Sequence, residues 1–481
     1  MEKQLPVTPP LPLKPYRKDR RSGAALVMAA LSLIVLVPML GLAIDGANVY
    51  LMRNQMNVAM EAAVLAATRS LNVGQTIDQQ SAAATAVADS VFNADTGAIP
   101  GMTMDPLGTQ TSQTAGPLFT VTQNNTTHYR TVTGSLSADL RLAFMGMMNL
   151  PTAHVNITVA ATRRDVNIVM VLDNGSGMGL VGGDTSVGTP LATLQTDAVA
   201  FVNVFANGRD NIGLVTFTSA PFVADALPNQ NFLSNVPNNI NTLTAAGQGG
   251  PNTSAGLEAA YQQLQNLNQP GALNVIVLFT DGIPTGFSGD FGSLLKSGQS
   301  ICAPTGGHVN GVIWNLPDGS GQPNGLSEPT TTGENYDASS QTAPSCPGGV
   351  VPRMANLLTG IPSVDLLNNA TIGSYPNAPV NLSSLSTQNI IYASENALDA
   401  AAATIRSDTA LLPVIFVIGL NGNPVLQPDP ILMAKIANDP SSSYYNSRQP
   451  AGQSIIAPST AQLQSAFSAI ASQVLRLAAG H

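Results

Sequence analysis

The sequence predicts an α/β protein with a doubly wound, mostly parallel sheet and a long insertion, preceded by an N-terminal transmembrane helix and a small α+β module. Residues 165–478 alternate short apolar runs, typical of buried strands, with amphipathic stretches typical of helices. Two of the apolar runs, in Val166–Met178 and Asn274–Gly282, end in an aspartate near glycine. A long uncharged stretch precedes all of these segments, which indicates a membrane anchor.

The predicted transmembrane helix comprises residues 22–44, SGAALVMAALSLIVLVPMLGLAI. Its 23 uncharged residues suffice to cross a hydrocarbon core of about 30 Å at about 1.5 Å per residue. A cleaved signal peptide is the alternative, but its apolar region spans roughly 7 to 15 residues, and no small-residue cleavage pattern precedes a polar start here. We therefore expect a single, retained span.

Charge sets the expected topology and excludes one class of partner. Residues 1–21 form a basic tail with six Lys or Arg against two acidic side chains, and Asp45 follows the span. The positive-inside rule therefore places the N-terminus in the cytoplasm and the bulk of the chain on the periplasmic or extracellular side of the cytoplasmic (inner) membrane. The net charge is -9, so the chain after the tail is acidic, and we expect no nucleic-acid partner.

Two segments follow the span before the α/β region. Residues 45–71 are predicted to continue as a helical stalk with a stripe of Met and Ala, which packs either on its own domain or on a similar helix of a partner. Residues 72–164 show Thr/Val alternation that predicts a small α+β module. The expected strands of this module are Leu118–Thr122, Thr131–Ser137 and His154–Ala160.

The α/β region of residues 165–478 has an expected order of strands and helices. Strands are predicted at Val166–Leu172, Asn211–Phe217, Leu273–Phe279 and Leu412–Ile418, with a hairpin through Phe222–Leu227. Helices are predicted near Leu191–Ala206, around Leu257–Leu264, at Ala393–Ser407 and around Leu463–Leu477.

A long insertion, at about residues 285–387, interrupts this order and is too long for a simple connection. It contains Cys302 and Cys346, the only two cysteines of the chain. An oxidising compartment favours a disulfide between them, worth roughly 4 kcal/mol by loop entropy, and the alternative is two unpaired thiols. A zinc site needs more ligands than these two and the nearby His308.

Two segments of the chain resemble known families. Residues 165–478 resemble a von Willebrand factor type A (vWA) domain, in which a metal-ion-dependent adhesion site (MIDAS) combines a DxSxS loop, a threonine and a later aspartate. Residues 20–71 resemble the N-terminal segment of TadG-like proteins of the Tad (Flp) pilus-assembly system, because a basic patch, an apolar span, Asp45-Gly46 and an Ala-rich helix follow in that order. The resemblance implies a membrane-anchored envelope protein of pilus assembly or adhesion.

The same resemblance implies a site for Mg²⁺ or another divalent cation. Asp173 and Asp281 match the two MIDAS aspartates. Ser176 and Thr253 stand close to the positions of family ligands and are the substitutes that the chain offers. The expected MIDAS-like metal site therefore comprises Asp173, Asp281, Thr253 and Ser176.

Departures from the family pattern open the alternative of a degenerate site. Gly175 and Gly177 stand where the family has its serines, and Pro251 stands at the threonine position. Magnesium requires near-octahedral oxygen coordination, so these losses weaken binding unless other oxygens substitute. Without a cation, both aspartates would accept hydrogen bonds from loop amides and cap the following helices.

Catalytic interpretations find little support in the sequence. A G-x-G-x-x-G spacing at Gly177–Gly182 lacks an acidic residue after the second strand, which a dinucleotide site needs. None of the four histidines lies in the loops that carry the two aspartates, so no Ser-His-Asp arrangement is expected. Paired carboxylates could do acid–base work, but loops rich in Gly, Ser and Thr are expected to desolvate them little.

The functional prediction is therefore a non-catalytic protein without a small-molecule substrate. It would take part in Tad pilus assembly or adhesion by protein binding, through a rim formed by Asp173–Gly179, Gly247–Ser254 and Asp281–Gly286. The expected partners are pilus-assembly or other envelope proteins. The alternative is a metal-independent structural scaffold with a degenerate adhesion site.

Overall fold

The computed structural model describes most of the chain and divides it into two compact units. The described residues are 22–74, 76–96, 102–104, 116–126, 128–179, 189–245, 250–294, 297, 310–314, 324–327, 358–421 and 427–479. By packing, one unit comprises Met1–Glu61, Phe92–Leu118 and Gly134–Val159, and the other comprises Ala62–Val91, Phe119–Thr133 and Ala160–His481. These two units do not test the domain boundaries predicted from the sequence, which remain a prediction.

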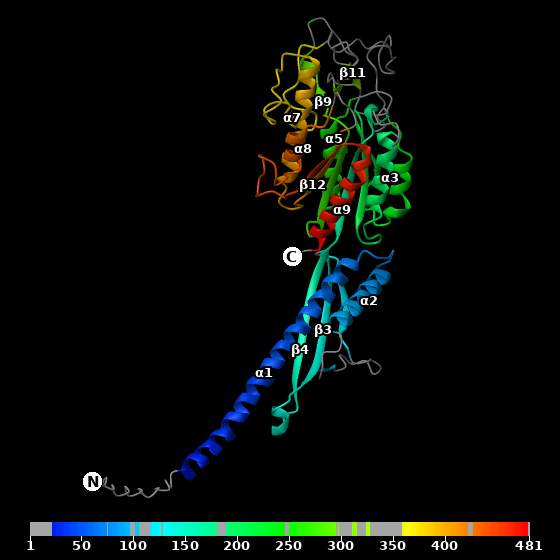
Figure 1. The fold of residues 1–481 in the computed structure, drawn as a ribbon. Helices are drawn as coiled ribbons and strands as arrows, with labels where there is room; N and C mark the ends of the chain where they lie inside the picture. The colour runs from blue at the N-terminus through cyan, green and yellow to red at the C-terminus, as the bar shows by residue number, and fades with distance from the viewer. Residues whose placement is uncertain are drawn as a thin grey trace, which may run out of the picture. The chain divides into compact units, whose positions relative to one another are not determined.

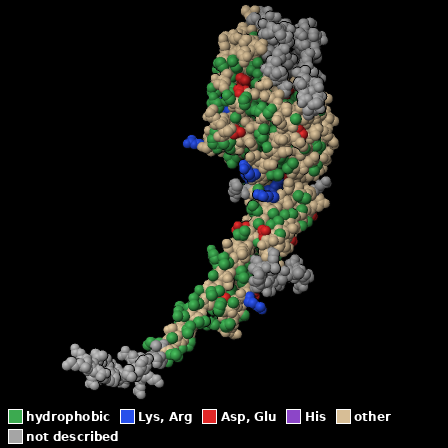
Figure 2. Space-filling view, in the orientation of Figure 1, with side chains coloured by type: hydrophobic (Ala, Val, Ile, Leu, Met, Phe, Trp, Pro, Cys, Tyr) green, Lys and Arg blue, Asp and Glu red, His purple; other side chains and the backbone are tan. Residues whose placement is uncertain are grey.

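Helix α1 extends over Ser22–Ser70 as one 49-residue element. Its apolar first half is exposed: only 6% of its most apolar 18-residue window is buried, and Figure 2 shows hydrophobic side chains covering this stretch. A core helix of a soluble protein would bury the same side chains. Length, composition and exposure thus agree with the predicted membrane-spanning helix.

The Met/Ala stripe on the second half of α1 packs within this chain. Met56 and Ala63 are fully buried and Ala59 is 2% exposed. Of the two alternatives for the stripe, the structure therefore favours packing on the protein itself. Helix α2, Ile77–Thr96, likewise buries its apolar residues, which include Ala84, Ala88 and Phe92.

Four strands form the sheet of the predicted α+β module. They are β1 (Met102–Met104), β2 (Leu118–Asn124), β3 (Tyr129–Arg141) and β4 (Thr152–Arg164). Strand β3 pairs with each of the other three. Strands β2, β3 and β4 confirm the three strands predicted from the Thr/Val alternation. A loop that contains the 3₁₀ turn η1 (Met145–Met148) joins β3 to β4.

The central sheet has six strands in the order β13-β12-β8-β5-β6-β7. Figure 1 shows the part of the chain that contains this sheet, with strand β12 labelled. Neighbours pair in parallel, except that β7 turns back antiparallel to β6 as the predicted hairpin. This confirms the predicted mostly parallel α/β sheet. The strands are β5 (Val166–Asp173), β6 (Asn211–Phe217), β7 (Pro221–Asp225), β8 (Leu273–Thr280), β12 (Val414–Leu420) and β13 (Ser454–Ala457).

Helices cover both faces of this sheet, which explains why its inner strands are mostly apolar and buried along their whole length. On one face pack α3 (Pro190–Val202), the short α4 (Val236–Asn241) and α9 (Leu463–Ala478). On the other face pack α5 (Thr253–Leu267), α7 (Thr387–Arg406) and α8 (Pro430–Ile436). The sheet is therefore doubly wound, as the sequence predicts.

The insertion contains secondary structure that the sequence does not predict. Strands β9 (Gly286–Asp290), β10 (Asn310–Trp314) and β11 (Asn324–Ser327) form a three-stranded antiparallel sheet. Phe287 and Phe291 at its start pack against α7. Cys302 and Cys346 lie outside the described residues, so the predicted disulfide stays a prediction.

Candidate functional site

The two aspartates singled out in the sequence meet at the carboxyl-terminal edge of the central sheet. Asp173 ends β5, and Asp281 follows β8 directly. Strands β5 and β8 are neighbours, and their register pairs Leu172 with Phe279, so Asp173 lies beside Thr280. The carboxyl ends of parallel strands are where ligands bind in open α/β sheets.

The loop that carries Thr253 joins this edge through backbone hydrogen bonds. Asn252 donates its N–H to the carbonyl of Thr218, after β6, at 2.7 Å. The Pro251 carbonyl accepts the N–H groups of Thr285 and Gly286, each at 3.2 Å. Three of the predicted residues, Asp173, Asp281 and Thr253, therefore lie in loops that meet at one edge, whereas the side chain of Ser176 lies outside the described part of the structure.

Asp173 is held by two local donors. The Gly175 N–H donates to its Oδ1 at 2.8 Å, and the Thr280 hydroxyl donates to its Oδ2 at 2.9 Å. The Asp173 side chain is completely buried, and Asp281 is 8% exposed. Both carboxyl groups are thus largely removed from water, and Asp281 is close enough to influence the charge of Asp173.

The electrostatics of this pair differ from the expectation. Burial, and then the neighbouring Asp281 carboxylate, raise the pKa of Asp173 well above its usual range, while burial raises the pKa of Asp281 to about 6. The expectation that these loops desolvate the carboxylates little is wrong. No ion pair among the described residues involves either carboxylate. Two buried acids without a counter-ion need either a shared proton or a bound cation.

Gly175 and Gly177, which stand where the family has serines, lie close to the two carboxylates. A Cβ atom on Gly177 would lie 2.4 Å from Asp281 Oδ2, and one on Gly175 would lie 3.0 Å from Asp173 Oδ1. The Asp281 carboxylate therefore fills space next to the backbone that a serine side chain would need. The glycine at position 177 is therefore compatible with the position of the Asp281 carboxylate in this structure, whereas a serine there would require the carboxylate to move.

The donor set fits a divalent cation in part. The Thr253 hydroxyl is buried without a hydrogen-bond partner, so it is free to supply an oxygen. Magnesium often binds one or two carboxylates and keeps several waters. In the described part of the chain no group of three or more His, Cys, Asp or Glu could hold a metal ion, so a cation here would depend on the two carboxylates, on hydroxyl oxygens such as that of Thr253, and on water.

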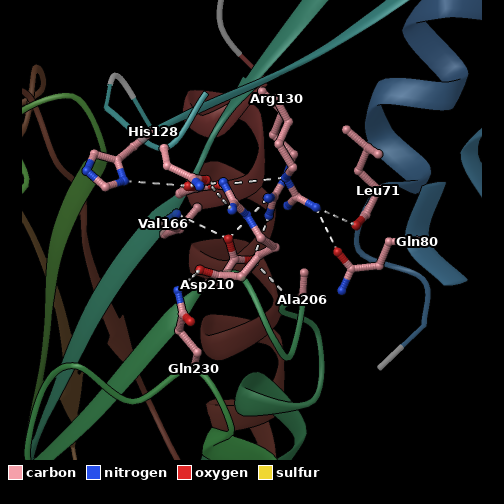
Figure 3. A network of polar contacts seen from close by, with 12 residues as sticks. Leu71, Gln80, His128, Arg130, Val166, Ala206, Asp210 and Gln230 are labelled. Carbon is pink, nitrogen blue, oxygen red and sulfur yellow. Dashed lines mark hydrogen bonds and ion pairs between the residues drawn. The ribbon is translucent and has the colours of Figure 1, made fainter. Parts of the chain in front are cut away.

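A second buried charge cluster, at the amino-terminal edge of the same sheet, is absent from the sequence predictions (Figure 3). Asp210 accepts two hydrogen bonds from Arg163, at 3.1 and 2.7 Å, and others from the N–H groups of Val166 and Ala206. Asp165 accepts from Arg209 at 3.3 and 2.6 Å. An Arg-Asp dipeptide immediately before β5 and again before β6 is the signal that could have revealed this cluster.

Arg130 connects this cluster to the helical segment that precedes it in the chain. Its Nε lies 3.6 Å from Asp165 Oδ1, and its Nη1 donates to the Gln80 side chain at 2.7 Å and to the Leu71 carbonyl at 3.2 Å. Gln80 in turn donates to the Asn207 carbonyl at 2.8 Å. Burial, and then the nearby Arg163, lower the pKa of Arg130 to about 10. The cluster therefore joins residues 71–80 to the base of the sheet.

Comparison with known families agrees with this geometry. Residues 167–301, within the α/β region, match the von Willebrand factor type A domain, which identifies a type A domain in this part of the chain. Residues 23–89 match the family described as putative Flp pilus-assembly TadE/G-like. The chain thus combines a TadE/G-like Flp pilus-assembly segment with a type A domain.

Several solved structures are distantly similar to this chain. The PilB minor pilin from Streptococcus sanguinis is 16% identical, with 75% of this chain and 78% of that chain covered and a TM-score of 0.38. The vWF domain of the type V pili tip protein Mfa5 from Porphyromonas gingivalis is 17% identical, with 66% and 97% covered and a TM-score of 0.35. Proximal thread matrix protein 1 from the mussel byssus, with a zinc-occupied MIDAS motif, is 10% identical, with 64% and 47% covered and a TM-score of 0.32. Likeness at this level carries no functional argument, and the search of curated proteins finds no match.

Proposed function

We propose that this protein is a membrane-anchored, non-catalytic component of Flp pilus assembly or adhesion that binds a partner protein through the carboxyl-terminal edge of its type A domain. One observation carries the proposal: a single chain joins a TadE/G-like segment to a type A domain. An exposed apolar helix at the start of the chain supports the anchor. The basic residues before that helix support a cytoplasmic N-terminus and a type A domain outside the cytoplasmic membrane.

The binding face in this proposal is the rim around Asp173, Asp281 and Thr253. These residues would hold Mg²⁺ or another divalent cation, and the cation would supply an open coordination position for a carboxylate or amide oxygen of the partner. The raised pKa values of the two carboxyl groups support this role, because a bound cation would neutralise the negative charge that burial makes costly. The partner would be a pilus-assembly or other envelope protein with an acidic or amide-bearing contact group.

A non-catalytic role has its own support in the described part of the chain. The two histidines there lie away from the carboxyl-terminal edge: His128 is 3.7 Å from Asp165, and His154 is 3.0 Å from Asp139. None of the described histidines therefore supplies the edge with the imidazole that a Ser-His-Asp mechanism requires. Protein binding fits a pair of carboxylates better than acyl transfer does.

A metal-independent scaffold is the second candidate. Gly175, Gly177 and Pro251 remove the three hydroxyl groups that the family pattern places at the site. In this alternative the two carboxyl groups share a proton, and the type A fold braces the assembly without a cation. The two candidates differ in whether function depends on the charge of Asp173 and Asp281.

Gene replacement in the source bacterium tests the proposal. Deletion of the gene is expected to abolish surface pili or adherence, and the wild-type gene should restore them. Asp173→Asn/Asp281→Asn should be produced at a normal level in the membrane yet fail to restore function. The matched control is Asp78→Asn/Asp95→Asn, which changes two exposed acids of α2 and should restore function fully.

Each outcome separates the candidates. Normal pili and adherence in the deletion strain would refute the proposed function. Full restoration by Asp173→Asn/Asp281→Asn would refute the cation-dependent binding face and leave the scaffold as the explanation.

A further inference from the structure

The loop between β3 and β4, residues Leu142–Pro151, presents an unusual apolar surface. Its sequence, LAFMGMMNLP, has no charged residue. Four of its large apolar side chains are exposed, namely Phe144 (39%), Met147 (87%), Met148 (59%) and Leu150 (54%). A water-exposed loop rarely carries so many large apolar side chains together, so this surface is a candidate for contact with a membrane or another protein.

This loop is fixed to α1 at the end of the membrane-spanning segment. The Asp45 carboxylate accepts the N–H groups of Ala143, Phe144 and Met145 at 3.0, 2.9 and 2.7 Å. One turn earlier, Gly41 faces the Phe144 ring so closely that a Cβ atom on Gly41 would lie 2.6 Å from Phe144 Cβ. All of these residues belong to the same compact unit.

The contact with Gly41 sets the depth of the loop. Gly41 lies within the uncharged run of residues 22–44, and it precedes Asp45 by about 6 Å along the helix axis at about 1.5 Å per residue. Leu40 and Leu42 beside it are 62% and 55% exposed, as expected for side chains that face lipid. If α1 crosses the membrane through this run, Phe144 lies at the boundary between headgroups and acyl chains.

The backbone of the loop suits such a place, because unpaired polar groups are costly in lipid. Three N–H groups of the loop donate hydrogen bonds to Asp45. Four more backbone N–H groups donate to backbone carbonyls at 2.8 to 3.3 Å: Leu142 to Pro151, Met147 to Phe144, Asn149 to Gly146 and Leu150 to Met145. Asp45 itself is only 2% exposed. The loop is therefore a folded, internally bonded turn that presents side chains rather than free backbone groups.

We infer that Leu142–Pro151 is a second membrane contact, which inserts Phe144, Met147, Met148 and Leu150 into the leaflet on the Asp45 side of the span. Asp45 acts as the latch that holds the loop against α1 at this depth. Arg141, exposed at the end of β3, stands next to the loop and suits an anionic headgroup. A lipid surface is favoured over a protein partner because the loop is continuous with the apolar face of the span.

Depth-dependent fluorescence quenching tests this inference on the full chain in lipid vesicles. Trp314 is the only tryptophan, so Trp314→Phe removes the native signal, and Met147→Trp places one indole in the loop. The vesicles contain phosphatidylcholine and phosphatidylglycerol, with bromine at a shallow acyl position, because interfacial segments insert roughly 5–10 Å into the headgroup/acyl boundary. The matched control in the same background is Phe222→Trp, at a position on β7 that is 51% exposed.

The expected result is a blue-shifted emission from the loop indole and quenching by brominated lipid several times stronger than in the control. Equal, weak quenching at both positions would overturn the inference. Blue-shifted emission without quenching would also overturn it, because the loop would then be covered by protein, such as a second copy of this chain.

A second variant tests the latch separately. Asp45→Asn in the Met147→Trp background is expected to reduce quenching while the chain still resists carbonate extraction from the membrane. Unchanged quenching in this variant would show that Asp45 does not hold the loop at its depth.

Discussion

The two ends of strand β5 carry buried acids in opposite electrostatic settings. At the amino-terminal end, Asp165 and Asp210 are surrounded by Arg130, Arg163 and Arg209. At the carboxyl-terminal end, Asp173 faces a second acid, and no basic side chain of the described residues pairs with either. The same strand therefore links a neutralised cluster to an unneutralised one.

The presence or absence of a basic partner distinguishes buried acids with a structural role from buried acids with a binding role. Although burial alone would raise it, Arg163, Arg130 and the Ala206 N–H lower the pKa of Asp210, so its charge is satisfied within the fold. Burial raises the pKa of Asp281 to about 6; only a backbone hydrogen bond opposes this shift, and no basic side chain of the described residues pairs with Asp281. Perturbed acids without an internal counter-charge are candidates for ligand binding. We therefore assign the arginine-rich end to stability and the carboxylate pair to function.

The largest expected effect comes from breaking the neutralised cluster. Asp210→Ala would leave Arg163 buried without its partner, and losses of this kind cost about 3–5 kcal/mol. The measurement is the free energy of unfolding of the full chain in detergent. Truncation at Asp165 is unsuitable, because it would remove Arg130 and Arg163.

The control for this experiment is Asp78→Ala, an exposed acid of α2, for which a change within about 0.5 kcal/mol is expected. A loss below about 1 kcal/mol for Asp210→Ala would mean that the arginine cluster does not hold the unit together.

Asp281 and Asp210, on the opposite edges of the sheet, should also respond to pH in opposite directions. Without divalent cations, the raised pKa of Asp281 means that folded protein holds a proton that unfolded protein releases, so stability should fall as pH rises from about 4 to about 6. Asp281→Asn should flatten this fall, which is on the order of 1–3 kcal/mol. The lowered pKa of Asp210 predicts the reverse: the stability that the charged Asp210 contributes is lost as the pH falls below the usual pKa of an aspartate.

Unfolding of the wild type and Asp281→Asn across pH 4 to 8 in EDTA provides the measurement. Identical pH profiles for the two proteins would contradict the assignment of an uncompensated charge to this end.

A smaller effect is expected from restoring a family residue. Gly177→Ser would place Cβ 2.4 Å from Asp281 Oδ2, so the carboxylate must move, and overpacking of this kind costs roughly 1–3 kcal/mol. We expect a value near the lower limit, because the end of an Asp side chain can rotate away. The added hydroxyl should strengthen cation binding at the same time.

Thermal unfolding in EDTA and in Mg²⁺ measures both effects. Gly46→Ser is the control, because a Cβ atom there meets nothing within 4 Å. A Gly177→Ser protein as stable as wild type in EDTA, with no gain from Mg²⁺, would argue against the described position of the Asp281 carboxylate.

Much of this architecture is encoded locally and could be predicted from sequence. The apolar run Asn211–Phe217 gives β6 with the same bounds, and the two apolar runs that lead to Asp173 and Asp281 form the neighbouring strands β5 and β8. Strand β13, four residues at the sheet edge and only partly buried, has too little periodicity to be recognised.

Long-range pairing accounts for what the sequence did not reveal. The arginine cluster unites Arg130 with Asp165 and Gln80, which are far apart in the chain, and no local pattern specifies such contacts. The same holds for the latch between Asp45 and Ala143–Met145. The raised pKa values arise from packing of several loops, whose composition alone suggested weak desolvation.

The central claim is that the carboxylate pair at the end of β5 binds a divalent cation. The most direct measurement is the melting temperature of the full chain at pH 7.5 in EDTA, Mg²⁺, Mn²⁺ or Ca²⁺, for the wild type and Asp173→Ala/Asp281→Ala. A cation at about 100 times its dissociation constant should stabilise the wild type by about 2.7 kcal/mol and leave the double variant unchanged. Equal melting temperatures of the wild type in EDTA and in all three cations would contradict the claim and favour the metal-independent scaffold.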